Sequence, residues 1–329
     1  MKKFIFISLI LSSSLLAQYS NLGSAGAQFL QIPVGAKATS MGGAYTGVAN
    51  DASAFFWNPA GLSNVQNWDA HFSYLKWFDL FDISAASVAF NVPEAGVFTF
   101  GLMSVSSEKM EITTETKPNG TGMFFDASDM VMGISFSRKL TDMFSVGITT
   151  KYIYQRIWNE VADGIAFDIG TQYNLGFQNM IIAMSMSNFG PDMKFEGPDL
   201  NINYSKDQNL PLSRLAPARL ETNEFALPLH FQVGISADLY QTHFMKVKGS
   251  LDVTHPNDNK ERINIGSEIS VFDRIFLRGG YKINYDVDKF SFGAGTNLPF
   301  SGTLLSFDYS YSIYDILPNV QRISLGVRF

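Results

Sequence analysis

The chain reads FSVGITTKYIYQ from Phe144 to Gln155, and this stretch alternates between two kinds of side chain. Successive side chains of a β-strand point to opposite faces, so the even-numbered residues share one face and the odd-numbered residues share the other. The even-numbered face is apolar and ends in tyrosines, whereas the odd-numbered face is mostly small or polar and includes Lys151. The pattern predicts a strand with one apolar face and one polar face that contacts water.

The same period of two returns at the C-terminus, over residues 304–313 and 322–329. A soluble β-sandwich also alternates, so further features are needed to separate the two classes. First, the polar faces carry ionisable side chains, which a water-filled lumen explains. Second, strands of about ten residues recur without helical segments between them, as in outer-membrane barrels. We assign to a water-filled lumen the charged residues Lys151, Lys246, Lys248, Asp252, Arg262, Glu268, Arg274, Arg278, Lys282, Asp308, Arg322 and Arg328.

Alternating runs predict an all-β fold, a 14-stranded antiparallel transmembrane β-barrel. The expected strands cover residues 68–76, 83–92, 96–106, 127–138, 143–157, 161–174, 179–189, 228–240, 243–255, 261–272, 274–285, 289–298, 302–313 and 319–329. Outer-membrane barrels have short periplasmic turns and longer external loops. The two long insertions, Ser107 to Asp126 and Gly190 to Leu227, both fall on odd-numbered connections, and this parity supports the count.

The N-terminus and the composition predict where the protein acts. Lys2 and Lys3 precede an apolar stretch that ends at Ala17, which is typical of a secretory signal peptide over residues 1–17; a retained membrane anchor is the alternative. The net charge is −6 and no basic tract is present, which argues against nucleic-acid binding. The chain has no cysteine, which excludes disulfides and thiolate metal sites. No Gly-x-Ser-x-Gly motif or metal-binding histidine spacing occurs, so we expect neither an enzyme nor a cofactor.

Residues 18–67 precede the barrel, which covers residues 68–329, and lack strand alternation. They are rich in Gly, Ala, Ser and Asn, residues that allow close backbone approach and tight turns. We predict an N-terminal Gly/Ala-rich plug, or hatch, inside or across the periplasmic mouth of the barrel. Its central motif comprises Met41, Gly42, Gly43, Ala44, Trp57, Asn58, Pro59, Ala60 and Gly61.

The stretch from Gly35 to Leu62 resembles the N-terminal signature of the PorV/PorQ family of outer-membrane proteins. That family is related to the FadL long-chain fatty-acid transporters, whose hatch carries an Asn-Pro-Ala motif like Asn58-Pro59-Ala60. The resemblance implies a 14-stranded barrel with an N-terminal plug in the outer membrane of a Gram-negative envelope. It also implies that Phe329, the terminal aromatic residue, serves as the assembly signal.

Two functions from different classes follow from this resemblance. The first is an accessory or interaction component of type IX secretion, with a translocon or cargo protein as partner. The alternative is a FadL-like transporter of hydrophobic small molecules. The insertion Gly190 to Leu227 mixes proline with many charges and offers few contiguous apolar residues, which favours the interaction function. Outer-membrane lipid is an expected partner in both cases, and a hydrophobic ligand in the second.

Overall fold

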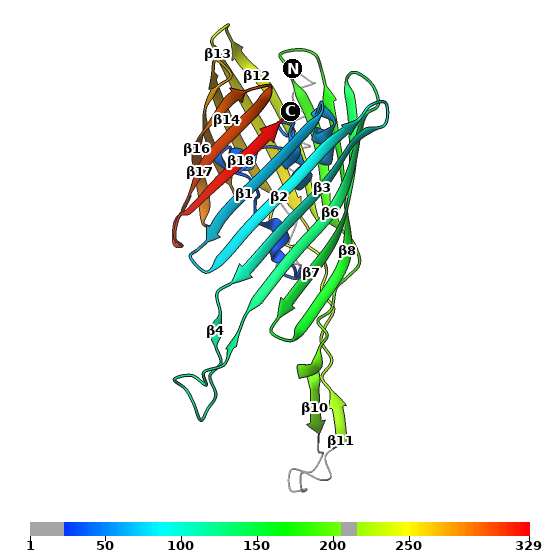
Figure 1. Cartoon of the computed structure of the whole chain (residues 1–329), viewed down its shortest axis with the longest axis vertical. Helices are drawn as coiled ribbons and strands as arrows, with labels where there is room; N and C mark the ends of the chain where they lie inside the picture. Colours follow the sequence, from blue (N-terminus) through cyan, green and yellow to red (C-terminus); the bar gives the residue numbers. More distant parts are fainter. Residues whose placement is uncertain (1–22, 205–215) are drawn as a thin grey trace, which may run out of the picture.

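The computed structural model describes residues 23–204 and 216–329, so the predicted signal peptide and residues 18–22 of the predicted plug lie outside the described residues. Fourteen antiparallel strands form a closed barrel in which β1 pairs with both β2 and β18 (Figure 1). The barrel strands are β1 (Trp68–Trp77), β2 (Phe81–Val92), β3 (Gly96–Ser107), β6 (Ala127–Lys139), β7 (Phe144–Ile157), β8 (Glu160–Asn174), β9 (Ile181–Phe189), β12 (His230–Gln241), β13 (Met245–Pro256), β14 (Arg262–Val271), β15 (Ile275–Ile283), β16 (Asp288–Phe300), β17 (Thr303–Tyr314) and β18 (Val320–Arg328).

The predicted fold class is confirmed, and every predicted strand overlaps one strand of the barrel. The two long insertions add hairpins that the sequence did not predict. These are β4 (Met110–Glu111) with β5 (Phe124–Phe125), and β10 (Asn201–Tyr204) with β11 (Ala216–Arg219). Both hairpins project from the same end of the barrel (Figure 1), which we call the long-loop end; the opposite end is the short-turn end.

The barrel wall has the two faces that the alternation predicts. On β7, Ile148 is exposed on the outside, and its neighbour Thr149 is buried inside. An outward row of aromatic rings follows the short-turn end, with centroids 5.3 Å apart for Trp68 and Phe90 and 5.9 Å apart for Phe90 and Phe98. Aromatic girdles of this kind mark the membrane interface in outer-membrane barrels. In the described residues, no helix is both long and apolar enough to cross a bilayer.

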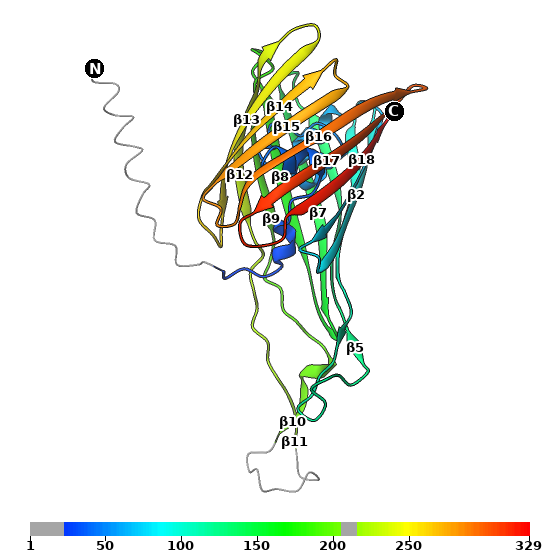
Figure 2. The ribbon, with the colours of Figure 1, turned by 90° about the vertical axis from the view of Figure 1, so that its left-hand side faces the viewer.

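Residues 23–67, which we call the interior segment, run through the barrel from the long-loop end to the short-turn end (Figure 2). Near their start, the Gly23 amide donates to the carbonyl of Asp258 in the β13–β14 connection, and at their end they continue into β1. The segment therefore extends along the barrel instead of lying only at the periplasmic mouth, where we expected it. Its helical turns are η2 (Gln28–Gln31), α2 (Ala36–Ser40), η3 (Ala52–Phe56) and η4 (Pro59–Asn64).

Two apolar clusters pack the interior segment against the wall. One lies between the segment and β2 and β3 and includes Tyr45, Val48 and Leu62. The other lies towards the long-loop end and includes Phe29 together with inward-facing residues of several strands. Ile153, which the alternation assigned to the polar face, belongs to this second cluster and is fully buried. The lumen is therefore apolar in part, because the interior segment displaces water from it.

Candidate functional site: two cavities beside the interior segment

Glycines in the wall let the interior segment approach the strands closely. A side chain at Gly280 would overlap backbone atoms of Met41 and Gly42, and one at Gly170 would overlap the side chain of Asn58. A side chain at Gly147 would likewise overlap the backbone of Pro59. The backbone of the segment thus lies directly on the backbone of the wall, which only glycine permits.

Thr46 is the centre of a polar network that ties the segment to two parts of the wall. The Asp252 carboxylate on β13 accepts hydrogen bonds from the Tyr45 amide (3.0 Å), the Thr46 amide (2.9 Å) and the Thr46 hydroxyl (2.6 Å). The Thr46 carbonyl accepts from Asn58 Nδ2 (3.0 Å) and from Gln172 Nε2 on β8 (3.3 Å). These bonds fix the segment across the lumen and satisfy buried polar groups that would otherwise destabilise the fold.

The predicted plug motif lies in the middle of the barrel. Asn58 caps η4, with its Oδ1 accepting from the Ala60 amide (3.1 Å), and Pro59 occupies the first helical position, where its missing N–H has no effect. Trp57 is half-buried, and its Nε1 donates to the Val34 carbonyl (2.8 Å). The other motif residues are all buried, namely Met41, Gly42, Gly43, Ala44, Ala60 and Gly61.

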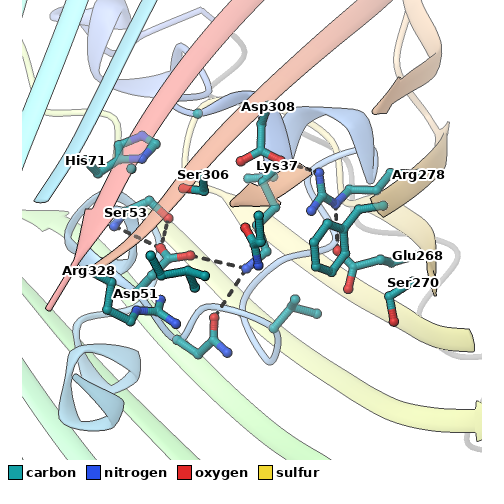
Figure 3. Close-up of a pocket in the computed structure, with 18 of the residues that line it drawn as sticks. Lys37, Asp51, Ser53, His71, Glu268, Ser270, Arg278, Ser306, Asp308 and Arg328 are labelled. Atoms are coloured by element: carbon teal, nitrogen blue, oxygen red, sulfur yellow. Dashed lines mark hydrogen bonds and ion pairs between the residues drawn. The ribbon is translucent and has the colours of Figure 1, made fainter. Parts of the chain in front are cut away.

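The first cavity, which we call the polar chamber, lies towards the short-turn end and has a volume of about 210 Å³. Figure 3 shows its charged side chains pointing toward one another. Lys37 and Asp51 of the interior segment are 3.2 Å apart, and Arg278 of β15 lies 2.6 Å from both Glu268 and Asp308. Most of the charged side chains here pair with an opposite charge, which favours a structural, water-accessible region over a site for one ion.

Lys37 and Asp51 neutralise each other in this chamber. The Asp51 carboxylate also accepts hydrogen bonds from the Ser53 amide at 3.0 Å and from the Tyr45 hydroxyl at 3.4 Å. Charge-assisted hydrogen bonds of this kind hold the ion pair in place.

The second cavity, which we call the amphipathic cavity, lies towards the long-loop end and has a volume of about 270 Å³. Its apolar side comes from the interior segment and from the ends of β1 and β17, and its polar side comes from β12, β14, β15 and β16. The apolar side includes Leu30, Ile32, Val34, Phe56, Trp57, Trp77 and Tyr314. The polar side includes His230, Gln232, Arg262, Asn264 and Lys282, together with Asp288 at the start of β16, whose carboxylate pairs with Lys282. Cavities that combine an apolar wall with a few polar groups are typical of small-molecule sites.

The base of the long insertion closes over this region with apolar side chains. Met193 and Leu227 are buried, and Phe195 and Phe225 pack against the same cluster as Phe29. The insertion also pairs with itself, since the Met193 and Phe225 amides each donate to the other residue's carbonyl at 2.9 Å. The insertion has few contiguous apolar residues, as the sequence indicates, but apolar residues from its two ends come together at its base, where Met193 and Phe195 alternate with charged residues.

All but one of the predicted lumen charges face the barrel interior. Arg274 is the exception and a correction: β14 ends at Val271 and β15 begins at Ile275, so Arg274 lies exposed in the turn between them. The others face the polar chamber, the amphipathic cavity or the packed lumen between them: Lys151, Lys246, Lys248, Asp252, Arg262, Glu268, Arg278, Lys282, Asp308, Arg322 and Arg328. In the described part of the chain, no group of three or more His, Asp or Glu side chains could hold a metal ion.

No protein-family model matches the chain, and no curated protein matches it in sequence. Solved structures do match. The toluene transporter TbuX of Ralstonia pickettii has a TM-score of 0.57 at 12% identity, with 90% of this chain and 98% of that chain covered. A FadL homologue of Pseudomonas aeruginosa has a TM-score of 0.56 at 12% identity, with 91% and 98% covered. The toluene transporter TodX of Pseudomonas putida has a TM-score of 0.54 at 12% identity, with 88% of this chain and 96% of that chain covered. The chain therefore shares the fold of the FadL-type outer-membrane barrels.

Proposed function

We propose that the protein is an outer-membrane channel for small hydrophobic molecules, with the amphipathic cavity as its ligand site. The observation that carries this proposal is the position of the cavity, at the long-loop end and next to the apolar cluster under the long insertion. In outer-membrane barrels the long loops face outward. A hydrophobic solute arriving from outside would therefore meet this cavity first. Two solved structures with the same fold are described as toluene transporters.

The interior segment separates the amphipathic cavity from the polar chamber. Lys37 and Ala38 line the polar chamber, whereas Gly42 and Gly43, a few residues later, line the amphipathic cavity. A solute that moves from one cavity to the other needs the segment to shift, so we propose that this segment is the hatch of the channel. The paired charges beyond it disfavour an apolar solute and would make release toward water the slower route.

Filling the cavity should block uptake. In the Ile32→Trp variant, the larger side chain should occupy much of the cavity, and uptake of toluene into cells should fall to about one-tenth of the wild-type rate. The matched control is Leu80→Trp, because Leu80 is exposed in the β1–β2 connection and does not line the cavity. Uptake of radiolabelled toluene, normalised to folded protein in the outer membrane, measures the effect. Unchanged uptake in Ile32→Trp would argue against this site.

An accessory role in protein secretion is the second candidate, and it rests on the two hairpins beyond the barrel (Figure 1) and on the PorV/PorQ resemblance. The β10–β11 hairpin can be removed cleanly, because the Leu220 amide donates to the Leu200 carbonyl at 2.8 Å. Deleting residues 201–219 and joining the ends with two glycines keeps Met193 and Phe195, which belong to the apolar cluster at the base of the insertion.

We expect this deletion to leave toluene uptake unchanged, because neither β10 nor β11, the described part of the hairpin, lines either cavity. Long loops also contribute little to the free energy of barrel closure. Affinity isolation from native outer membranes, before and after the deletion, measures the competing function. Recovery of secretion components with the intact protein and their loss with the deletion, together with no uptake of any hydrophobe, would favour the secretion role instead.

A further inference from the structure

We propose that the amphipathic cavity selects a small aromatic acid, a ligand with one ring and one carboxylate, over a plain hydrocarbon. This inference rests on the proposed function of the cavity as the ligand site. It concerns the polar side of the cavity, which a hydrocarbon would leave unused.

The apolar side is suited to a flat ring. Trp57 is held in one orientation by the hydrogen bond from its Nε1 to Val34, and Trp77 meets Tyr314 edge to face with ring centroids 6.0 Å apart. Edge-to-face packing is a preferred arrangement for aromatic rings, and a ring of the ligand can extend it. The volume of about 270 Å³ lies just under the usual range of roughly 300–1,000 Å³ for ligand sites, which favours a compact molecule over a long acyl chain.

The polar side contains a cation without a carboxylate partner. Among residues 23–204 and 216–329, no carboxylate forms an ion pair with Arg262, and its buried Nε atom has no hydrogen-bond partner. The guanidinium lies over the ring of Tyr285, at 4.6 Å from the centroid. The neighbouring cation, Lys282, is different, because it pairs with Asp288 and is already neutralised. Arg262 is thus the cation that a ligand can still neutralise.

Three further lining groups have a buried polar atom without a hydrogen-bond partner: Asn264, His230 and Asp288. The carboxylate of Asp288 is the one that pairs with Lys282, so the two groups that can turn a donor toward a ligand are Asn264 and His230. Asn264 lies two residues along β14 and therefore on the same face, and its buried Oδ1 has no partner. His230 of β12 also lines the cavity, and its buried Nδ1 has no partner either. The amide and the imidazole can each donate a hydrogen bond in one of their orientations or tautomers. Arg262, Asn264 and His230 together form a polar end for the cavity.

A carboxylate would satisfy these groups, and a hydrocarbon would not. An arginine guanidinium binds a carboxylate through charge-assisted hydrogen bonds, often two at once. A hydrocarbon in the same place would exclude water from Arg262, Asn264 and His230 and offer no hydrogen bond in return, which is unfavourable. The ring would pack between the aromatic side chains while the carboxylate faces β14.

The test uses the purified full-length protein in detergent and the probes phenylacetate, phenylacetamide, ethylbenzene and palmitate. Trp57 and Trp77 line the cavity, so quenching of tryptophan fluorescence reports binding. We expect phenylacetate to bind tightest, and the Arg262→Gln variant to weaken phenylacetate about tenfold or more while ethylbenzene binding stays unchanged. The matched control is Arg156→Gln, because Arg156 pairs with Asp126 and does not line the cavity.

The outcomes separate this inference from the proposed function. If ethylbenzene binds as well as phenylacetate, or if Arg262→Gln weakens both probes equally, the preference for an acid is wrong and the hydrophobe channel stands. If palmitate binds more tightly than phenylacetate, the inference of a compact ligand is wrong. If no probe binds and cells expressing the protein take up no toluene, the proposed function itself fails.

Discussion

Replacing Gly280 with valine should prevent the interior segment from seating in the barrel, whereas the same change at the adjacent Gly279 should be tolerated. A side chain at Gly280 would overlap the backbone of Met41 and Gly42, and backbone cannot rotate away as a side chain can. At Gly279 the nearest atom to an added Cβ is Ser267 Oγ, at an ordinary 3.9 Å. The two residues are consecutive on β15 and therefore face opposite sides of the wall.

Overpacking of a tight interior typically costs about 1–3 kcal/mol, and a clash between two backbones belongs at the upper end or beyond it. We therefore expect Gly280→Val to expose the segment around Trp57 to protease and to lower the temperature of barrel unfolding. Gly279→Val should behave like the wild type in both measurements. Equal protease resistance of the two variants would show that the segment does not depend on this close contact.

The barrel was predictable from the sequence because each strand carries its own signal, the alternation of outward and inward side chains. Residues such as Ile148 and Thr149 must alternate along any strand that separates lipid from a lumen, and connection lengths then give the parity of the ends. The path of the interior segment was not predictable in the same way. Its helical turns are too short to have a periodic signature, and contacts with distant wall residues such as Asp252 and Gly280 determine its course.

The two cavities were not predictable from the sequence for the same reason, since residues distant in the chain form them. The sequence identified Arg262 as a lumen charge and Trp57 as part of the plug motif, but barrel closure places both beside the same cavity as Trp77 and Tyr314. Charged residues dominate the composition of the long insertion, whereas apolar residues lie near its two ends. Met193, Phe195, Phe225 and Leu227 flank those charges in the sequence, and this flanking position is the signal that could have indicated a folded base.

Introducing arginine at Leu325 should strongly destabilise the protein in a membrane. Leu325 faces outward on β18 with 48% of its surface exposed, and its cross-strand partners Phe72 and Phe307 are exposed on the same face. It lies between the aromatic row at Trp68 and the tyrosines Tyr74 and Tyr309, which places it within the apolar band. An arginine facing lipid costs about 2–4 kcal/mol at the bilayer midplane. We expect a loss of this size in the free energy of unfolding from lipid vesicles.

The control must keep the strand and the face but change the depth. The Ser324→Arg variant, which the alternation suggests as a mild change on the polar face, is unsuitable, because Ser324 is buried and its hydroxyl accepts the Ala36 amide at 2.9 Å. Gln321 is suitable, because it is exposed on β18 near the long-loop end. Its Oε1 accepts a hydrogen bond from the Tyr309 hydroxyl at 3.0 Å. Arginine near the interface costs only about 0–1 kcal/mol, so Gln321→Arg should unfold nearly as the wild type does. If the two arginine variants lose equal stability, depth is not the cause, and Leu325 does not face the middle of a bilayer.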